Sequence, residues 1–113
     1  MSIITNNIKD VSIIIADVDR ATTIVAESFK NSVKFEIASN NIKFIFDLSS
    51  CEFIDSTFLS AIVTSYKRIV EHGGSLKIVG LKPAVKSMFQ LTRLDKIFEI
   101  YKNEKEALSS LAE

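Results

Sequence analysis

The first third of the chain changes from a strand-like to a helix-like hydrophobic pattern. Residues 3–8 and 11–18 are rich in isoleucine and valine, and the polar pair Lys9-Asp10 separates them, so they predict a hairpin of two strands. Beyond them, apolar side chains recur at four-residue steps with charged residues between, which predicts an amphipathic helix ending at Asn40-Asn41. Its apolar stripe is Val25, Phe29, Val33 and Ile37, and its water-facing residues are Glu27, Lys30, Lys34 and Glu36. The short polar residues that are expected to start this helix are Asp17, Asp19, Thr22 and Thr23.

The remaining chain repeats strand and helix signals with short connections. Residues 42–48 (IKFIFDL) predict a strand buried on both faces, and residues 56–72 predict a helix that ends at Gly73-Gly74, with one of these glycines left-handed. The buried face of that helix is expected at Leu59, Ile62, Val63, Tyr66 and Val70. Further along, the pattern predicts a strand at 75–79, a helix starting near Pro83, a short strand at 97–101 and a terminal helix around 107–111.

This alternation is typical of an α/β layer fold. Short connections between strands and helices favour a mainly parallel sheet with right-handed crossovers. The expected architecture is therefore a single domain over residues 1–113, with a mixed, mainly parallel sheet of about five strands and about four helices.

The composition of the chain limits which partners and which cellular setting are expected for the protein. The 113 residues include 47% hydrophobic residues, 14 lysines and arginines, and 14 aspartates and glutamates, a balance that does not favour capture of nucleic acid or of an anionic membrane. One cysteine, Cys51, excludes an internal disulfide and a zinc site made of cysteine pairs. No basic segment followed by an apolar run starts the chain, and no apolar stretch approaches the roughly 20 residues that span a bilayer. We expect a cytoplasmic protein without metal, cofactor, nucleic-acid partner or direct membrane insertion.

The candidate site is the stretch 46–60 (FDLSSCEFIDSTFLS). Asp55 stands directly before Ser56 and Thr57 where a helix begins, and Asp47 closes the strand upstream. Taken alone, hydroxyl residues at this position are typical of helix caps. The sequence offers no nucleophile with a base and an orienting group, no phosphate-binding glycine loop and no metal cluster, so we do not expect an enzyme. Cys51 has no neighbouring cation in the sequence to lower its pKa, and we expect an inert thiol there.

Three segments together resemble the STAS domain family, the sulfate transporter and anti-sigma factor antagonist domains. Residues 16–19 (ADVD) are similar to the family's G-E-L-D turn. Residues 46–57 (FDLSSCEFIDST) are similar to its central strand, loop and aspartate-serine-serine/threonine switch. Gly73-Gly74, SLKIVGL and KPAVKSMFQLTRLDKIFEIY follow the second half of the family pattern. The chain resembles in particular the small free-standing bacterial anti-sigma factor antagonists.

The resemblance implies a protein that binds other proteins. In this family the first hydroxyl after the switch aspartate is phosphorylated by a serine kinase that also holds a sigma factor, and that residue here is Ser56. The unphosphorylated antagonist binds the kinase and frees the sigma factor, and a phosphatase resets the phosphorylated form. Asp19 is expected near the switch, in contact with the kinase or its nucleotide, while Asp47 and Asp55 frame the serine. The expected partner-binding residues are Asp19, Asp55, Thr57, Phe58 and Ser60, with Asp47 in a supporting role.

The chain departs from the family pattern in two segments. The switch normally continues with glycine, leucine and often glycine, where this chain has Phe58, Leu59 and Ser60. Phe58 is expected to obstruct a kinase or to anchor a different partner, unless it packs into the core. It therefore keeps open an alternative, a constitutive STAS subunit of another complex such as a lipid ABC transporter, docked on an ATPase without phosphate chemistry. Arg93 replaces a glycine, which costs about 1 kcal/mol if the site is left-handed.

Overall fold

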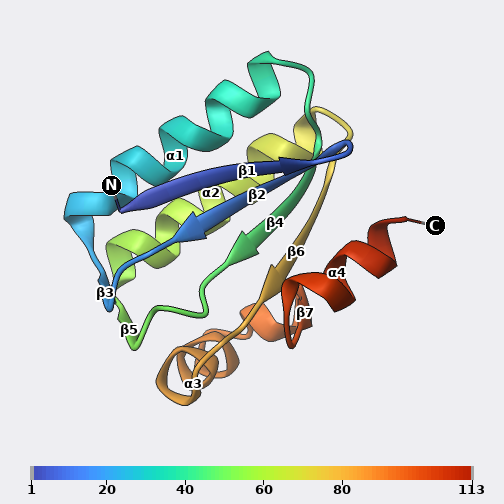
Figure 1. Ribbon diagram of the computed structural model, residues 1–113. Coiled ribbons are helices and arrows are strands. Elements are labelled where there is room, and N and C mark those ends of the chain that lie inside the picture. Colours follow the sequence, from blue (N-terminus) through green and yellow to red (C-terminus); the bar gives the residue numbers. More distant parts are fainter. Residues whose placement is uncertain (1, 113) are drawn as a thin grey trace.

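Five strands form one sheet in the order β1-β2-β4-β6-β7 (Figure 1). The computed structural model describes residues 2–112, so the two end positions of the predicted domain lie outside it. The strands are β1 (Ile3–Ile8), β2 (Val11–Ala16), β4 (Lys43–Asp47), β6 (Ser75–Val79) and β7 (Glu99–Tyr101). Strand β1 pairs antiparallel with β2, and the other pairs are parallel. The predicted α/β class and mixed, mainly parallel sheet are confirmed.

The helices form a layer on each face of the sheet. Helices α1 (Thr23–Ala38) and α2 (Ser56–Glu71) lie side by side on one face, and α4 (Glu104–Leu111) lies on the other (Figure 1). Helix α3 (Pro83–Leu91) packs beside a 3-10 turn (Leu94–Lys96). A second, two-stranded sheet of β3 (Arg20–Ala21) and β5 (Phe53–Ile54) was not predicted.

Aromatic rings fill the core between the sheet and the α1–α2 layer. Phe29 meets Phe46 edge-on at 4.7 Å and Phe58 at 5.0 Å between ring centroids. A smaller core lies under α4, where the sheet contributes Val11, Ile13, Ile45 and Val79 and the helix contributes Ala107 and Leu111. The two cores use opposite faces of β4, because successive side chains of a strand alternate between faces. Phe44 and Phe46 therefore face the helices α1 and α2, and Ile45 faces α4.

One residue of the predicted water-facing set is buried. Glu36 is only 5% exposed, so its expected place in water is wrong. Its Oε1 accepts hydrogen bonds from Asn7 Nδ2 at 2.8 Å, Ser12 Oγ at 2.8 Å and Asn41 Nδ2 at 3.0 Å. Burial alone raises the pKa of the Glu36 carboxyl, but these bonds hold it below its usual value. The carboxylate thus ties the end of α1 to the β1–β2 hairpin.

The buried face of α2 also differs from the predicted one. Val70 is 49% exposed, whereas the residues of α2 that are buried are Phe58, Ala61, Ile62, Ser65 and Ile69. Because a helix has 3.6 residues per turn, residues at fixed four-residue steps do not stay on one face. In addition, α2 packs against α1 as well as against the sheet, so its buried face is broader than a single stripe. Ile62 belongs to both sets, and Leu59 and Tyr66 of the predicted face are partly buried against the same core.

Gly73 and Arg93 have the left-handed backbone conformation that the sequence suggested. Gly73 has φ of 79°, so one glycine of the pair is left-handed as predicted. At Gly74 an added Cβ would collide with the carbonyl oxygen of Ile42. Arg93 has φ of 63°, so the strain of about 1 kcal/mol expected for a non-glycine residue applies there.

Candidate functional site

Asp55 caps two helices at once. It is the N-cap of α2, where its Oδ1 accepts a hydrogen bond from the Phe58 backbone N–H at 2.8 Å. Its Oδ2 accepts a second one from the backbone N–H of Thr23, the first residue of α1, at 3.3 Å. Thr22 is the N-cap residue of α1, at the helix start that the sequence predicted, but its side chain makes no capping hydrogen bond. One carboxylate from the switch segment therefore fixes the amino ends of both helices on this face.

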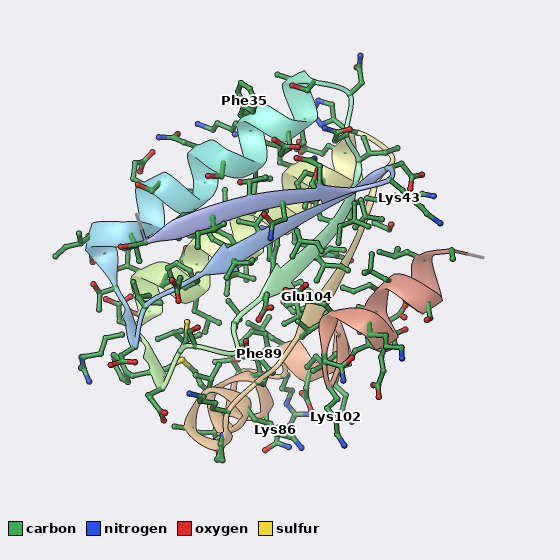
Figure 2. The ribbon with its side chains drawn as sticks, viewed as in Figure 1. Phe35, Lys43, Lys86, Phe89, Lys102 and Glu104 are labelled. Atoms are coloured by element: carbon green, nitrogen blue, oxygen red, sulfur yellow. The ribbon has the colours of Figure 1, made fainter. Side chains whose placement is uncertain are left out.

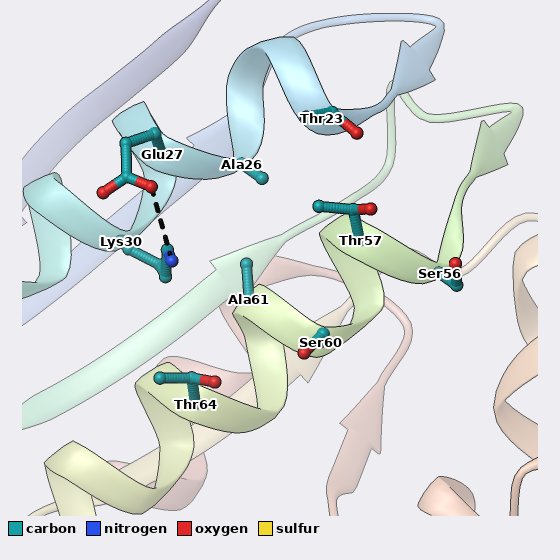
Figure 3. A pocket seen from close by; sticks show the side chains of 9 residues that line it. All are labelled: Thr23, Ala26, Glu27, Lys30, Ser56, Thr57, Ser60, Ala61 and Thr64. Carbon is teal, nitrogen blue, oxygen red and sulfur yellow. Dashed lines mark ion pairs between the residues drawn. The ribbon is translucent and has the colours of Figure 1, made fainter.

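Ser56 is exposed at the amino end of α2, beside a groove between α1 and α2 (Figure 3). The groove holds about 340 Å³ and is lined mainly by hydroxyl side chains. On α2 these are Ser56, Thr57, Ser60 and Thr64, and on α1 the hydroxyl is that of Thr23. Glu27 and Lys30 form an ion pair at 3.4 Å on the α1 wall. Ser56, Thr57 and Ser60 could be predicted from the sequence, whereas the α1 residues could not, because only helix packing brings them to the same groove.

Phe58 takes no part in this surface. Its side chain is fully buried and packs against Phe29, so its expected role in partner binding is wrong. The alternative that Phe58 packs into the core is confirmed. The reason is helical geometry: Ser56, Thr57 and Ser60 lie on the exposed side of α2, while Phe58 points toward the sheet.

Asp47 lies away from Ser56, contrary to the expectation that it frames the serine. It follows Phe46 by one residue, so its side chain points to the opposite face of β4, the face that α4 covers. Its Oδ1 accepts hydrogen bonds from the Ser49 backbone N–H at 2.9 Å and from Ser49 Oγ at 2.6 Å. With Glu104, which is labelled in Figure 2, it lines a hollow beside the first turn of α4.

Asp19 is joined to the loop that leads into α2. Its backbone carbonyl accepts hydrogen bonds from the N–H groups of Glu52 at 2.7 Å and Phe53 at 3.1 Å, and its side chain is exposed. The parallel pairing of β3 with β5 continues this contact as far as Ile54, next to Asp55. The structure therefore brings the ADVD turn to the switch loop, while a contact between Asp19 and a kinase stays a prediction.

Cys51, the single cysteine, is a buried free thiol. Cys51 is buried, and burial together with the nearby carboxylate of Asp47 raises the pKa of its thiol to about 11. A thiol with that pKa carries little thiolate at neutral pH, so it is a poor nucleophile. Among residues 2–112, no cluster of three or more histidine, cysteine, aspartate or glutamate side chains is arranged to hold a metal ion. No helix in the same range is long and apolar enough to cross a membrane.

Glu104 and Asp47 line the same hollow, and their carboxyl groups are coupled through a shared proton. Hydrogen bonding to Asp47 through this proton, then burial and the Asp47 charge, raise the pKa of Glu104 to about 7. Burial raises the pKa of Asp47, but its bonds with Glu104 and Ser49 keep it below its usual value. One proton is thus shared between the end of β4 and the first turn of α4.

The shared proton predicts a loss of stability as the pH rises. Because Glu104 keeps its proton in the folded state up to about pH 7 while the unfolded chain loses it near 4.5, stability should fall as the pH rises through this window. The Glu104→Gln variant, whose amide still donates to Asp47, should abolish the fall. Thermal unfolding at several pH values between 5 and 8 measures it. Glu106→Gln on the same helix is the matched control, and equal pH slopes for wild type and both variants would contradict the shared proton.

The comparison with known families gives one assignment. Residues 5–107 match the model of the STAS domain. The chain belongs to the STAS domain family.

Its relatives include free-standing anti-sigma factor antagonists. A segment of 67 residues is 34% identical to an anti-sigma F factor antagonist of Paenibacillus polymyxa, and covers 59% of this chain and 57% of that protein, little more than half of either. A candidate anti-sigma factor antagonist of Thermotoga maritima has a similar structure, with a TM-score of 0.91, 29% identity, and coverage of 98% of this chain and 95% of that one. The phosphorylated form of the Bacillus cell fate determinant SpoIIAA shares the fold, with a TM-score of 0.77, 14% identity, and coverage of 96% and 98%.

Proposed function

We propose that the protein is an anti-sigma factor antagonist that is switched by phosphorylation of Ser56. In the unphosphorylated state it binds an anti-sigma factor serine kinase in the cytoplasm and causes release of a sigma factor. Phosphorylation ends this binding, and a phosphatase restores it. The observation that carries the proposal is the position of Ser56, the first residue of α2, exposed and directly after the capping Asp55.

The local structure suits a kinase substrate. The Asp55 cap holds the backbone at the start of the helix, through the N–H of Phe58. Among the described residues 2–112, the hydroxyl of Ser56 makes no side-chain hydrogen bond that a kinase would have to break. We assign Thr57 and Ser60 to the docking surface, because they are exposed and line the same groove. Asp19 would contact the kinase or its nucleotide from the adjoining turn.

The burial of Phe58 supports access to Ser56. Its ring occupies the core, so the replacement of the family's glycine adds no bulk to the surface on which a kinase would dock. The same burial removes the observation that favoured a constitutive subunit of a transporter complex. The proteins that share the fold include one in a phosphorylated form, which supports the proposal that this fold tolerates phosphorylation.

The proposal is tested by incubating the full chain with the candidate kinase and ATP and locating phosphate by mass spectrometry. We expect one phosphate on the peptide that contains Ser56. Ser56→Ala should abolish the modification, and Thr57→Ala should retain it, because the two hydroxyls are adjacent but only the first follows Asp55. A chain that stays unmodified yet binds the kinase tightly would contradict the phosphorylation switch and favour constitutive binding.

A further inference from the structure

The outer edge of β1 carries backbone groups that no strand among residues 2–112 pairs with. The N–H of Asp17 donates to the carbonyl of Ser2 at 2.7 Å, and these residues are directly opposite in the register of the hairpin. In an antiparallel pair such hydrogen-bonded positions alternate with positions whose N–H and C=O point away from the partner strand. The residues that point outward are therefore Ile3, Thr5 and Asn7.

The two edges of the sheet are protected to different degrees. Proteins commonly guard an edge strand by making it short or by placing charges or proline on it. Strand β7 has three residues, and its Glu99 accepts a hydrogen bond from Lys77 at 2.8 Å. Strand β1 has six residues, IITNNI, with no charge, proline or glycine. The edge at β1 is therefore open to another strand.

Apolar side chains flank this open edge on both faces. A continuous hollow runs between β1 and α1, where two pockets share Asn31 and Ser32. Ile24, 87% exposed, stands at one end of the hollow. Phe35, 68% exposed and labelled in Figure 2, stands at the other end. On the opposite face Ile4 and Ile8 are exposed, because α4 packs mainly on β4, β6 and β7.

We propose that this edge is a dimer interface at which β1 of a second copy pairs antiparallel about a twofold axis at Thr5. In this register Thr5 is opposite its own copy and Ile3 is opposite Asn7, so each outward backbone group meets a partner. Because the twofold axis is perpendicular to the sheet, the same face of both copies lies on the same side of the joined sheet. The α1 helices of the two copies therefore lie next to each other. Because Ile24 lies beside Ile3 and Phe35 lies beside Asn7, each Ile24 then meets the Phe35 of the other copy.

The chemistry of the edge favours a second copy over a different protein. The strand is uncharged and offers nothing to select a charged partner, and the α1 stripe beside it, Ile24, Ser28, Asn31 and Phe35, is also uncharged. With a net charge of zero, two copies do not repel each other. The dimer leaves Ser56 accessible, because the groove at Ser56 lies on the other flank of α1, lined by Ala26, Glu27 and Lys30.

A disulfide at the twofold axis tests the register. Hydrogen-bonded antiparallel positions have Cα atoms about 5.5 Å apart, within the roughly 4.4–6.8 Å that a disulfide spans. The Thr5→Cys variant should form a reducible covalent dimer under mild oxidation, seen on a non-reducing gel. Ser87→Cys on the exposed side of α3 is the matched control, and the native Cys51 is buried and does not compete. Equal cross-linking of both variants would overturn the proposal.

A charge-pairing experiment uses the full chain without cross-links. In sedimentation equilibrium, the average mass of the wild-type protein should rise toward the mass of a dimer as the protein concentration increases. Thr5→Lys and Thr5→Glu should each dimerise at least several-fold more weakly, because like charges face each other across the axis, and an equal mixture of the two variants should recover the dimer. A wild type that stays monomeric at every concentration, or a mixture no heavier than its components, would overturn the proposal. Circular dichroism of each variant confirms that it is folded.

Discussion

Replacing Phe58 with alanine is expected to lower the free energy of unfolding by about 3–5 kcal/mol. The ring is fully buried between α2 and the sheet and meets Phe29 at 5.0 Å. Its removal loses the transfer energy of the ring and leaves a cavity that the neighbouring rings fill only in part. Because a domain of this size has a total stability of about 5–15 kcal/mol, the loss should be evident in chemical denaturation.

Phe35→Ala is the matched control for this prediction. Phe35 also lies on a helix of the same face but is 68% exposed, so its loss should change the stability by no more than about 0.5 kcal/mol at low protein concentration. Phe58→Leu keeps most of the volume and should cost less than about 1.5 kcal/mol. It should also leave kinase binding unchanged, because the side chain does not reach the surface. Equal losses for the two alanine variants would mean that Phe58 is not a core residue.

The elements that sequence patterns predicted are those whose signal is local. The strand Ser75–Val79 has the predicted bounds, and the hairpin, the central strand and the helices lie within a few residues of their expected places. Strands β3 and β5 were missed because each has two residues and exists only by pairing with the other, more than 30 positions away. No periodicity can be read from two residues.

In the candidate site, too, the features with a local sequence signal were predicted and those that depend on packing were not. Capping is a local event, so the order Asp55-Ser56-Thr57 placed a helix start correctly. The second bond of Asp55, to Thr23, depends on how α1 packs on α2 and has no local signal. Strand alternation could have separated Asp47 from Ser56, since Asp47 follows the buried Phe46 by one position. Helix geometry could likewise have turned Phe58 inward, because it lies four residues before the apolar Ile62.

The Ser56→Asp variant is expected to keep the fold and to lose kinase binding. A negative charge in the first turn of a helix gains about 0.3–1 kcal/mol from the helix dipole. In the free protein it is opposed by repulsion from Asp55, about 1 kcal/mol for two charges 4 Å apart in water. These terms nearly cancel, so the circular dichroism spectrum should remain native.

Within a complex the balance changes, because a partner excludes water from the same surface. At the effective dielectric of a protein surface the repulsion between two such charges grows to about 4 kcal/mol. Asp55 cannot move away to relieve it, since its two oxygens hold the amino ends of α1 and α2. Each 1.4 kcal/mol corresponds to about a tenfold change in affinity, so binding to the kinase should weaken by at least tenfold.

Calorimetric titration of the kinase with wild type, Ser56→Asp and Ser109→Asp measures this effect. Ser109 is exposed on α4, on the other face of the sheet, so the same added charge should leave the affinity unchanged. Ser56→Ala removes the hydroxyl without adding charge and should bind as wild type does. A collapsed spectrum for Ser56→Asp would place Ser56 in the folding of the protein rather than at an interface. Equal affinities for the two aspartate variants would mean that the kinase docks elsewhere. A partner that covers Ser56 would bury the added charge beside the fixed Asp55 carboxylate, and its affinity would fall.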